Sequence, residues 1–425
     1  MEYDSVRNIK KECIKMNLRK VVGLSASVLF ASLTLAGCGE KEDPNTIVFW
    51  NPLTGDDGAY MDNMVKEYNA TDPEYPIKSI VTSDMYTKIY TVMSSKKDVP
   101  DLTLIHADRV PGFVKSDMLE PMDDVISLKS EIVSENYLPQ AWSAGTVDNT
   151  QYTVPLDIHS SAMYYNIDLL EKYDAMSFLD DKVVTFDEMM SLNGQMEDGD
   201  FVVNNALLSW CILAQIINLG GDIQSEGLPT VNTPEMKKAF EELKGLADAG
   251  LMTPNGEDGY LMFQSGNVIF STDGTWSSTA HSEVEGLNFG VTNIYSNTAE
   301  KFTNRASSHL FSMLSNDART DEKEAGIADF LEYIRENSIE WAKAGQIVAS
   351  RDVVDSPDFK EYKQSFFTSD DTAIESLHIF TYEYYPYVEE AINTYCFDIV
   401  YGEMDLEEGL ATMQKFVEDK IAENQ

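Results

Sequence analysis

The sequence is poor in cysteine and in positive charge, and each shortage excludes a class of protein. Four cysteines among 425 residues cannot supply the dense disulfide framework of a small secreted domain. The 31 Lys and Arg residues face 72 Asp and Glu residues, which gives a net charge of -41. Such a charge repels nucleic-acid phosphate and anionic lipid, so we expect no nucleic-acid partner and no basic membrane patch. The simplest consequence of the acidity is solubility.

Familiar catalytic and metal-binding motifs are also missing. The chain contains no G-x-S-x-G, H-E-x-x-H, G-x-G-x-x-G, P-loop or complete EF-hand loop. Its five histidines lie singly along the sequence, so no local metal cluster is visible and we predict neither a metal nor another cofactor. Paired carboxylates are unavoidable in so acidic a chain. They are a weak signal, and they leave a secreted carbohydrate-active hydrolase as an alternative.

The one long apolar run lies near the N-terminus. An apolar run spans Val21 to Leu35, basic residues precede it, and Leu35-Ala-Gly-Cys38 closes it. A basic segment, a short apolar core and a small-residue site are typical of a secretory signal peptide, and the run is short for a membrane span. The Leu-Ala-Gly-Cys close resembles the lipobox of bacterial lipoproteins, which implies acylation of Cys38. We therefore predict a signal peptide over 1–37, starting at Met1 or Met16, and a tether over 38–45.

The segment 38–425 is longer than a single hydrophobic core usually organises, which favours two lobes. Short strand-like runs at 46–50, 77–82, 101–107 and 152–156 are separated by stretches with helical spacing. This alternation predicts α/β layers. The sequence favours two buried thiols at Cys211 and Cys396 and leaves a disulfide between them open. Helix starts are indicated by the capping box Thr185-Phe-Asp-Glu188 and by Thr233-Pro234, and the last helix by Leu406, Leu410, Met413, Val417 and Ile421.

Several segments form an ordered series. They are Ile47-Val-Phe-Trp-Asn-Pro-Leu-Thr-Gly55, Val99-Pro-Asp-Leu-Thr-Leu104, Tyr152-Thr-Val-Pro-Leu156 with Met163-Tyr-Tyr-Asn-Ile-Asp-Leu-Leu170, Asn218-Leu-Gly-Gly221, and Phe263-Gln-Ser-Gly266 through Asp273-Gly-Thr-Trp276. This series resembles the extracellular solute-binding proteins of ATP-binding-cassette sugar importers, the family that includes maltose-binding protein. Thr275 departs from the resemblance, since many relatives carry Pro there, and it leaves the geometry of that turn open.

The resemblance implies a two-lobed periplasmic-binding-protein-like fold of type II, with discontinuous α/β lobes joined by crossing hinge strands. Crossings are expected near 156–158, 306–308 and 347–350. Lobe one would hold 45–156 and 307–346, and lobe two would hold 157–306 and 347–425. Ligand that contacts both lobes would stabilise a closed form, which docks on a membrane permease.

Candidate ligand residues follow from the needs of a sugar, which presents flat C–H faces and hydroxyl groups. The resemblance implies that Trp276 and Trp210 stack on the ligand and that His159 bonds it. Core positions for both tryptophans and a hinge role for His159 stay open. The first turn and the end of an early strand, where open α/β sheets place ligands, add Asn51, Leu53, Thr54, Gly55, His106 and Asp108. Further candidates are Tyr86, Asp157, Asp222, Asp273, His309, Arg351 and Tyr385.

Arginine is scarce after the predicted signal peptide. Residues 38–425 contain only five: Arg109, Arg305, Arg319, Arg335 and Arg351. An anionic ligand usually requires an arginine clamp, so we predict a neutral sugar or oligosaccharide. The predicted function is a lipid-anchored, extracellular or periplasmic, monomeric protein that delivers carbohydrate to an importer without catalysis. A ligand sensor for a membrane kinase is the other alternative, because the same cleft would serve it.

Overall fold

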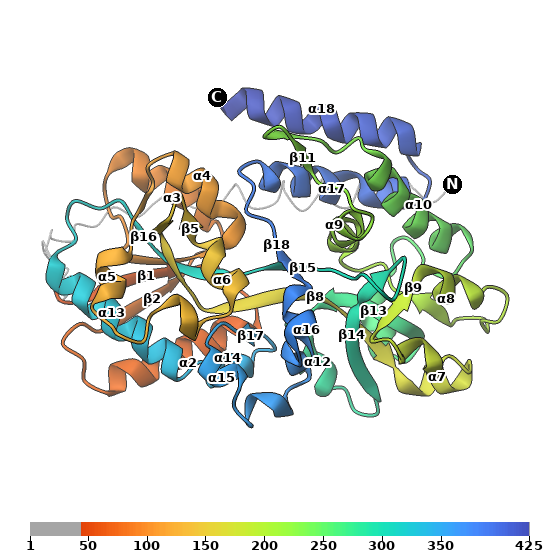
Figure 1. The fold of residues 1–425 in the computed structure, drawn as a ribbon, viewed down its shortest axis with the longest axis horizontal. Helices are drawn as coiled ribbons and strands as arrows, with labels where there is room; N and C mark the ends of the chain where they lie inside the picture. The colour runs from red at the N-terminus through yellow and green to blue at the C-terminus, as the bar shows by residue number, and fades with distance from the viewer. Residues whose placement is uncertain (1–43, 425) are drawn as a thin grey trace, which may run out of the picture. The chain divides into compact units, whose positions relative to one another are not determined.

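Two mixed sheets organise the part of the chain that the computed structural model describes, residues 44–424 (Figure 1). Residues 44–425 form one compact unit. The predicted signal peptide and Cys38 lie outside the described residues. The short strands and the intervening helices confirm the α/β class expected from the alternating sequence pattern.

The first sheet is built mainly from the N-terminal third of the chain. Strand β1 pairs in parallel with β2 and β3, and β16 returns to pair antiparallel with β3. The order is β2 (Ile77–Val81), β1 (Ile47–Asn51), β3 (Leu102–His106), β16 (His309–Leu314) and β4 (Leu119–Glu120), with β7 (Thr153–Pro155) also on β16. Strands β1, β2, β3 and β7 fall on the four runs that the sequence pattern predicted, whereas β4 and β16 were not predicted.

The second sheet is centred on β8 (Asp157–Asn166), a ten-residue strand that is buried along nearly its whole length. Strands β13, β14, β15 and β17 all pair antiparallel with β8. The order is β10 (Phe201–Val203), β13 (Val268–Gly274), β8, β14 (Phe289–Ser296) and β9 (Val183–Thr185), with β15 (Asn304–Ser307), β17 (Ile347–Val348) and β18 (Leu377–Ile379) off this path.

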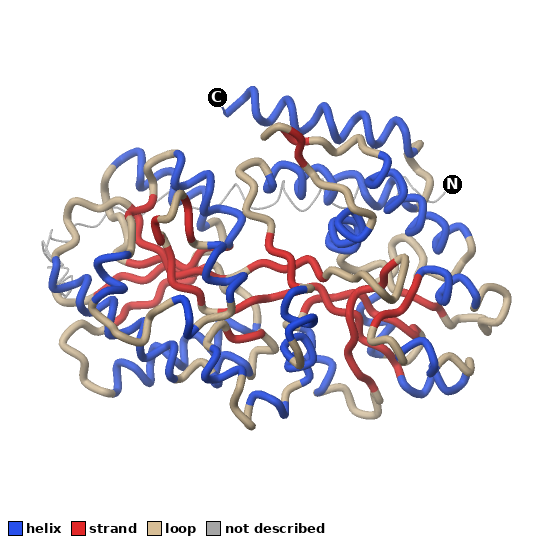
Figure 2. The backbone as a smooth tube through the Cα atoms, viewed as in Figure 1, coloured by secondary structure: helices blue, strands red, loops and turns tan. Residues whose placement is uncertain are grey.

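Helices cover both sheets, as Figure 2 shows. The first sheet carries α2 (Asp56–Ala70), α3 (Met85–Ser95), α4 (Val110–Lys115), α5 (Asp123–Ser127), α6 (Pro139–Ala144), α13 (Asp321–Glu336) and α14 (Ile339–Ala342). Beside the second lie α7 (Ile167–Lys172), α8 (Phe186–Ser191), α9 (Leu208–Asn218), α11 (Gly259–Gln264) and α12 (Ser277–Ser282). An outer layer of α10 (Pro234–Asp248) and α17 (Tyr385–Val400) packs on α9, and α18 (Leu406–Asn424) packs on α17 and α10. Short helices α15 (Arg351–Val354) and α16 (Asp371–Glu375) follow β17.

Local sequence signals explain several helix starts. Asn166 accepts a hydrogen bond from the Leu169 amide and so caps α7. Thr185 and Glu188 form the predicted capping box of α8, and Thr233 caps α10 just before the proline at its first turn. These contacts satisfy backbone N–H groups that would otherwise lack partners at the helix ends.

The chain passes between the sheets at Asp157. Strand β7 belongs to the first sheet and β8 to the second. The chain returns at Ser308, because β15 before this residue belongs to the second sheet and β16 after it belongs to the first. The Asp157 carboxylate is fully buried and accepts hydrogen bonds from the His309 amide at 2.9 Å and from Trp341 Nε1 at 2.7 Å. Ser308 Oγ donates to the Asp157 carbonyl at 2.5 Å. These contacts fix the connection, while the lobe boundaries drawn from the resemblance stay predictions.

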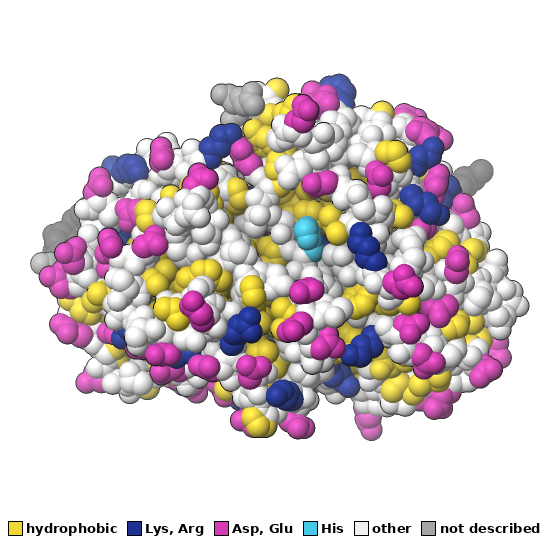
Figure 3. Space-filling model, viewed as in Figure 1, with side chains coloured by type: hydrophobic (Ala, Val, Ile, Leu, Met, Phe, Trp, Pro, Cys, Tyr) yellow, Lys and Arg dark blue, Asp and Glu magenta, His cyan; other side chains and the backbone are white. Residues whose placement is uncertain are grey.

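Cys211 and Cys396 are free, buried thiols, which confirms the favoured expectation for this pair. Burial raises the pKa of each to about 12, so both stay protonated near neutral pH. Among the described residues, no helix combines the length and apolar character needed to cross a bilayer. Acidic side chains are spread over the face seen in Figure 3, in keeping with the composition.

Candidate functional site

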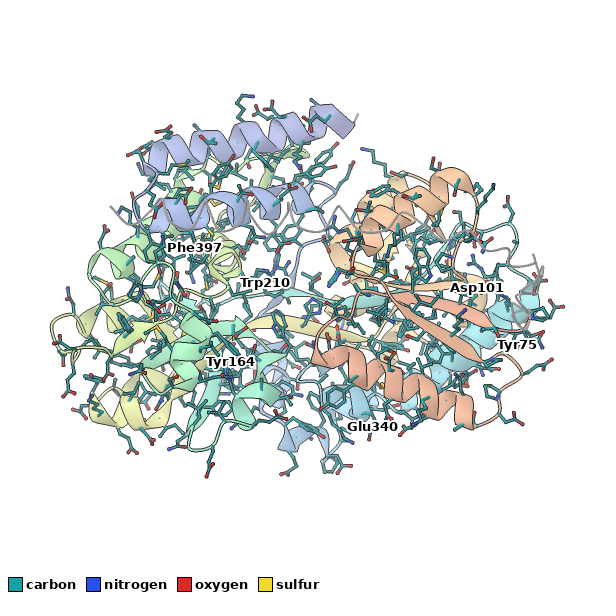
Figure 4. The ribbon with its side chains drawn as sticks, turned by 180° about the vertical axis from the view of Figure 1, so that it is seen from behind. Tyr75, Asp101, Tyr164, Trp210, Glu340 and Phe397 are labelled. Atoms are coloured by element: carbon teal, nitrogen blue, oxygen red, sulfur yellow. The ribbon has the colours of Figure 1, made fainter. Side chains whose placement is uncertain are left out.

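A cleft of about 860 Å³ lies where the two sheets approach each other, a size usual for small-ligand sites. The first-sheet side contributes the turn after β1, the start of α3 and the end of β3. The second-sheet side contributes α9, the start of α12 and β15. Figure 4 shows Trp210 of α9 beside the strands that run between the sheets.

Many of the predicted residues line this cleft. They come from segments far apart in the sequence, and the fold gathers Leu53, Thr54, Gly55, Tyr86, His106, Asp108, His159, Trp210, Trp276 and His309 around one volume. The end of β3 and the turn after β1 therefore contribute side chains to the cleft, as expected for an open α/β sheet that binds its ligand at the strand ends.

Six predicted residues lie outside the lining: Asn51, Asp157, Asp222, Asp273, Arg351 and Tyr385. Asn51 is buried and its side-chain oxygen accepts from the Leu53 amide at 3.2 Å, so it shapes the first turn instead. Arg351 donates Nε to the Tyr137 carbonyl at 3.0 Å. Asp222 lines a separate hollow with His378.

The other three act from behind the cleft wall. Tyr385 accepts hydrogen bonds from Arg305 at 2.8 and 2.5 Å. Asp273 is buried and accepts from the Gly274 amide at 2.7 Å, and burial raises its pKa to about 6. Asp157 supports two histidines of the cleft, as described below.

Two tryptophans form an aromatic corner. The ring centroids of Trp210 and Trp276 lie 5.4 Å apart with their planes at 85°. The guanidinium carbon of Arg305 lies 3.4 Å from the Trp210 ring centroid, so it covers one face of that ring. Trp276 is half-buried, whereas the buried Trp341 lies behind the crossing.

The backbone before Trp276 is shaped for this ring. A Cβ atom on Gly274 would meet carbon atoms of the Trp276 ring at 2.2 Å, which is far too close, so only glycine fits beneath it. The Thr275 amide donates to the Ser160 carbonyl at 2.9 Å. A proline at position 275 could not make this hydrogen bond, because proline has no backbone N–H. Thr275 therefore ties the turn before Trp276 to β8, which answers the question that the sequence left open about its geometry.

Three histidines meet at the cleft floor. His106 ends β3, His159 lies on β8 and His309 starts β16, and one nitrogen of each lies within 4.8 Å of a nitrogen of the other two. The Nδ1 atom of His309 lies 2.8 Å from Asp157 Oδ2 and that of His159 lies 3.3 Å from Oδ1. The Nδ1 atom of His106 lies 2.5 Å from the Tyr86 hydroxyl. Sequence spacing gave no sign of this cluster.

The electrostatics of the cluster differ from ring to ring. Burial lowers the pKa of His106 well below its usual value and that of His159 to about 4, so both are neutral near pH 7. Burial opposes the charged form of His309 as well, but the charge and hydrogen bond of Asp157 outweigh it and raise the pKa of His309. Burial alone would raise the pKa of Asp157, yet His309 and the hydrogen bonds of both imidazoles hold it well below its usual value.

The cleft also holds charged groups that pair with one another. Arg305 Nη2 lies 2.9 Å from Glu389 Oε1, and Arg109 Nε lies 3.0 Å from Asp108 Oδ2. Burial raises the pKa of Asp108 even though Arg109 lies beside it. These pairs leave the wall polar but locally balanced in charge.

Sequence reasoning missed several lining residues. Arg305 directly precedes the predicted crossing at 306–308, so its position was a usable signal. Other missed residues lie on helices or loops, among them Asp57, Tyr60, Tyr260, Ser277, Glu283, Gln346, Glu389 and Asn393. Glu389 and Asn393 share one face of α17 because they are four residues apart, but nothing in the sequence shows that this face meets the cleft.

A cleft between two α/β layers, at strands that cross from one to the other, defines a two-lobed binding protein. Residues 63–368 match the family model described as bacterial extracellular solute-binding protein, and the chain belongs to this family. The family resemblance noted in the sequence is thereby confirmed.

Curated relatives match only part of their length. The arabinooligosaccharide-binding protein of Halalkalibacterium halodurans is 23% identical over 251 residues, which cover 55% of this chain and 55% of that protein. The chain thus spans about half the length of this relative. The match supports the family rather than a particular ligand.

Solved structures share the fold over nearly their whole length. An ABC substrate-binding protein from Listeria monocytogenes, in complex with cycloalternan, has a TM-score of 0.74 at 16% identity and covers 89% of this chain and 99% of that one. UgpB from Mycobacterium tuberculosis, in complex with glycerophosphocholine, has a TM-score of 0.73 at 15% identity with coverages of 89% and 99%. These likenesses confirm the predicted two-lobed fold.

Proposed function

We propose that the chain is a lipid-anchored extracellular binding protein that captures a carbohydrate between its lobes and delivers it to an ATP-binding-cassette importer. The observation that carries the proposal is the combination of two indole rings with polar side chains in one cleft of about 860 Å³. A pyranose needs flat apolar surfaces for its C–H faces and hydrogen-bonding groups for its hydroxyls. The oligosaccharides named for one relative and one structural neighbour support the same ligand class.

The charge pairs of the cleft favour a ligand without net charge. Arg305 is paired with Glu389 and bonded to Tyr385, and Arg109 Nε lies beside Asp108, so each arginine charge in the cleft already has a carboxylate partner. A sugar hydroxyl carries no net charge and so leaves these pairs intact.

Binding without turnover is part of the proposal, because the family consists of solute-binding proteins. Product analysis after long incubation with a bound oligosaccharide tests this point. We expect the sugar to be returned intact. Release of shorter sugars, abolished when one cleft carboxylate such as Glu389 is replaced by Gln, would establish the hydrolase instead.

Ligand identity is tested by thermal unfolding of the full-length chain against a sugar panel. A ligand at about 100 times its dissociation constant adds about 2.7 kcal/mol to the free energy of unfolding. The panel includes neutral oligosaccharides, acidic sugars and glycerophosphocholine. Stabilisation by neutral oligosaccharides supports the proposal, whereas stabilisation by glycerophosphocholine alone would replace carbohydrate with a charged ligand.

The anchor is tested by Cys38→Ser. Stable anchoring requires more than one acyl chain, and Cys38 is the acylation point that the lipobox-like sequence provides. We expect the variant to lose lipid labelling, and we expect no protein cleaved at Cys38 in the membrane fraction. Unchanged lipid labelling would refute the anchor and leave the binding function intact.

A further inference from the structure

The three histidines at the cleft floor have the arrangement of a metal site. We propose that His106, His159 and His309 bind a divalent transition-metal ion such as Zn²⁺ through their Nε2 atoms, with an open coordination position facing the cleft. Imidazole nitrogen is a preferred ligand of Zn²⁺, and three protein ligands with one open position are usual where a further molecule can bind. The proposal goes beyond carbohydrate binding and does not depend on it.

Strand register brings the histidines together. His309 is the direct partner of His106 across the antiparallel pair β16–β3, and His159 is the partner of Ser307 across β8–β15. The ring centroids lie 4.9 Å apart for His106 and His309, and 4.3 Å apart for His159 and His309. The ligands thus stand on strands rather than on loops, which holds a coordination site in place.

The hydrogen bonds of the rings select the atoms that face the ion. Each Nδ1 atom has an oxygen partner: Asp157 for His159 and His309, and the Tyr86 hydroxyl for His106. Metal-binding histidines almost always donate their second ring N–H to such an oxygen, which orients the ring and raises its basicity. The Nε2 atoms are thereby left for a metal, and all three residues line the cleft.

The surrounding charges favour a cation. Asp157 is a fully buried carboxylate beside two of the rings, and Asp57 in the first turn of α2 lines the same cleft. Arg109 and Arg305 oppose a cation, but each is paired with a carboxylate, Asp108 and Glu389 respectively.

The first test uses the full-length chain in detergent, stripped with a chelator and then dialysed against Zn²⁺ alone. Elemental analysis should find one Zn²⁺ per chain. His309→Gln should weaken Zn²⁺ binding by more than about 100-fold, and Tyr86→Phe, which removes only an orienting partner, by about 10–100-fold. His378→Gln is the matched control, because this histidine lies on β18 outside the cleft, and it should retain the ion. No stoichiometric Zn²⁺ in the unaltered chain, or equal retention by His309→Gln, would overturn the proposal.

The second test distinguishes loss of the metal site from misfolding and from failure of the proposed sugar-binding function. Co²⁺ bound to three imidazoles should give visible absorption bands that disappear in His106→Gln but not in His378→Gln. Circular dichroism in chelator shows whether each variant is folded. Sugar binding is measured in chelator as well, so a chain that binds its sugar but gives no Co²⁺ bands overturns the metal site and leaves the carbohydrate function standing.

Discussion

At the residue scale, Trp276 is the side chain on which the ligand class most depends. Its ring rests on Gly274 and meets Trp210 edge-on, and it is only half-buried in the described structure. A ring placed in this way is available to a ligand without being needed for the core. A substitution of Trp276 can therefore distinguish a role in ligand binding from a role in core packing.

Trp276→Ala should weaken sugar binding by about 2 kcal/mol, or roughly 30-fold, because a central aromatic contact is lost. The free energy of unfolding should change much less than the 3–5 kcal/mol usual for a core tryptophan. Calorimetric titration and chemical denaturation of the same variant measure both quantities. Trp142→Ala is the control, since Trp142 is also half-buried but packs against Tyr137 and does not line the cleft. Normal binding by a strongly destabilised Trp276→Ala would assign this residue to the core.

Asp273 predicts a pH dependence of stability. Burial raises its pKa to about 6 in the folded protein, against 3.8 for an unperturbed Asp. The folded state therefore holds a proton that the unfolded state has lost between about pH 4 and pH 6, and the contribution of Asp273 to stability falls as pH rises through this window. The loss reaches at most about 3 kcal/mol above pH 6.

Asp273→Asn should remove this dependence, since an amide does not titrate and its oxygen can still accept from the Gly274 amide. The free energy of unfolding of the variant, relative to the unaltered chain, should rise between pH 4 and pH 7. Urea denaturation at a series of pH values measures it. A constant difference across this range would show that Asp273 titrates normally.

At the element scale, the end of β13 and the start of α12 position the aromatic corner. In Gly274→Ala, the new Cβ would meet the Trp276 ring at 2.2 Å, so the ring must move from its present position. Such a displacement costs on the order of 1 kcal/mol, which is a loss of roughly 5–10-fold in affinity. Sugar titration measures the loss. Gly112→Ala in α4 is the control, because nothing lies within 4 Å of its added Cβ, and its affinity should be unchanged.

Elements were more predictable from the sequence than the site. Strands β1 and β3 follow from short apolar runs, and the start of α8 from its capping box, because these signals act locally. The His106–His309 contact was not predictable, since it depends on the register of two strands about 200 residues apart. Glu389 was missed for a similar reason, because the packing of α17 rather than its sequence turns that side chain to the cleft.

At the scale of the whole molecule, a two-lobed cleft predicts closure on ligand. Helices α2 and α12 line the cleft from opposite sides, through Tyr60 and Thr279 among others. Spin labels at the exposed Lys66 and Ser282, on these two helices, should move closer when the sugar binds. Small-angle scattering should show a smaller radius of gyration in the same sample.

The control for closure is a sugar that gives no thermal stabilisation, added at the same concentration. It should leave both the label distance and the radius of gyration unchanged. Unaltered values at saturating ligand would instead describe a rigid pocket, in which the crossing at Asp157 acts as a fixed joint rather than a hinge.

The tryptophan corner has a practical consequence. Two of the five tryptophans in the chain, Trp210 and Trp276, stand in the cleft within 5.4 Å of each other. Indole emission responds to the polarity around the ring and to nearby charge, and Trp210 lies directly against the guanidinium of Arg305. A ligand that displaces solvent from this corner would change the intrinsic fluorescence of an unlabelled sample. The protein thus carries its own optical reporter of occupancy.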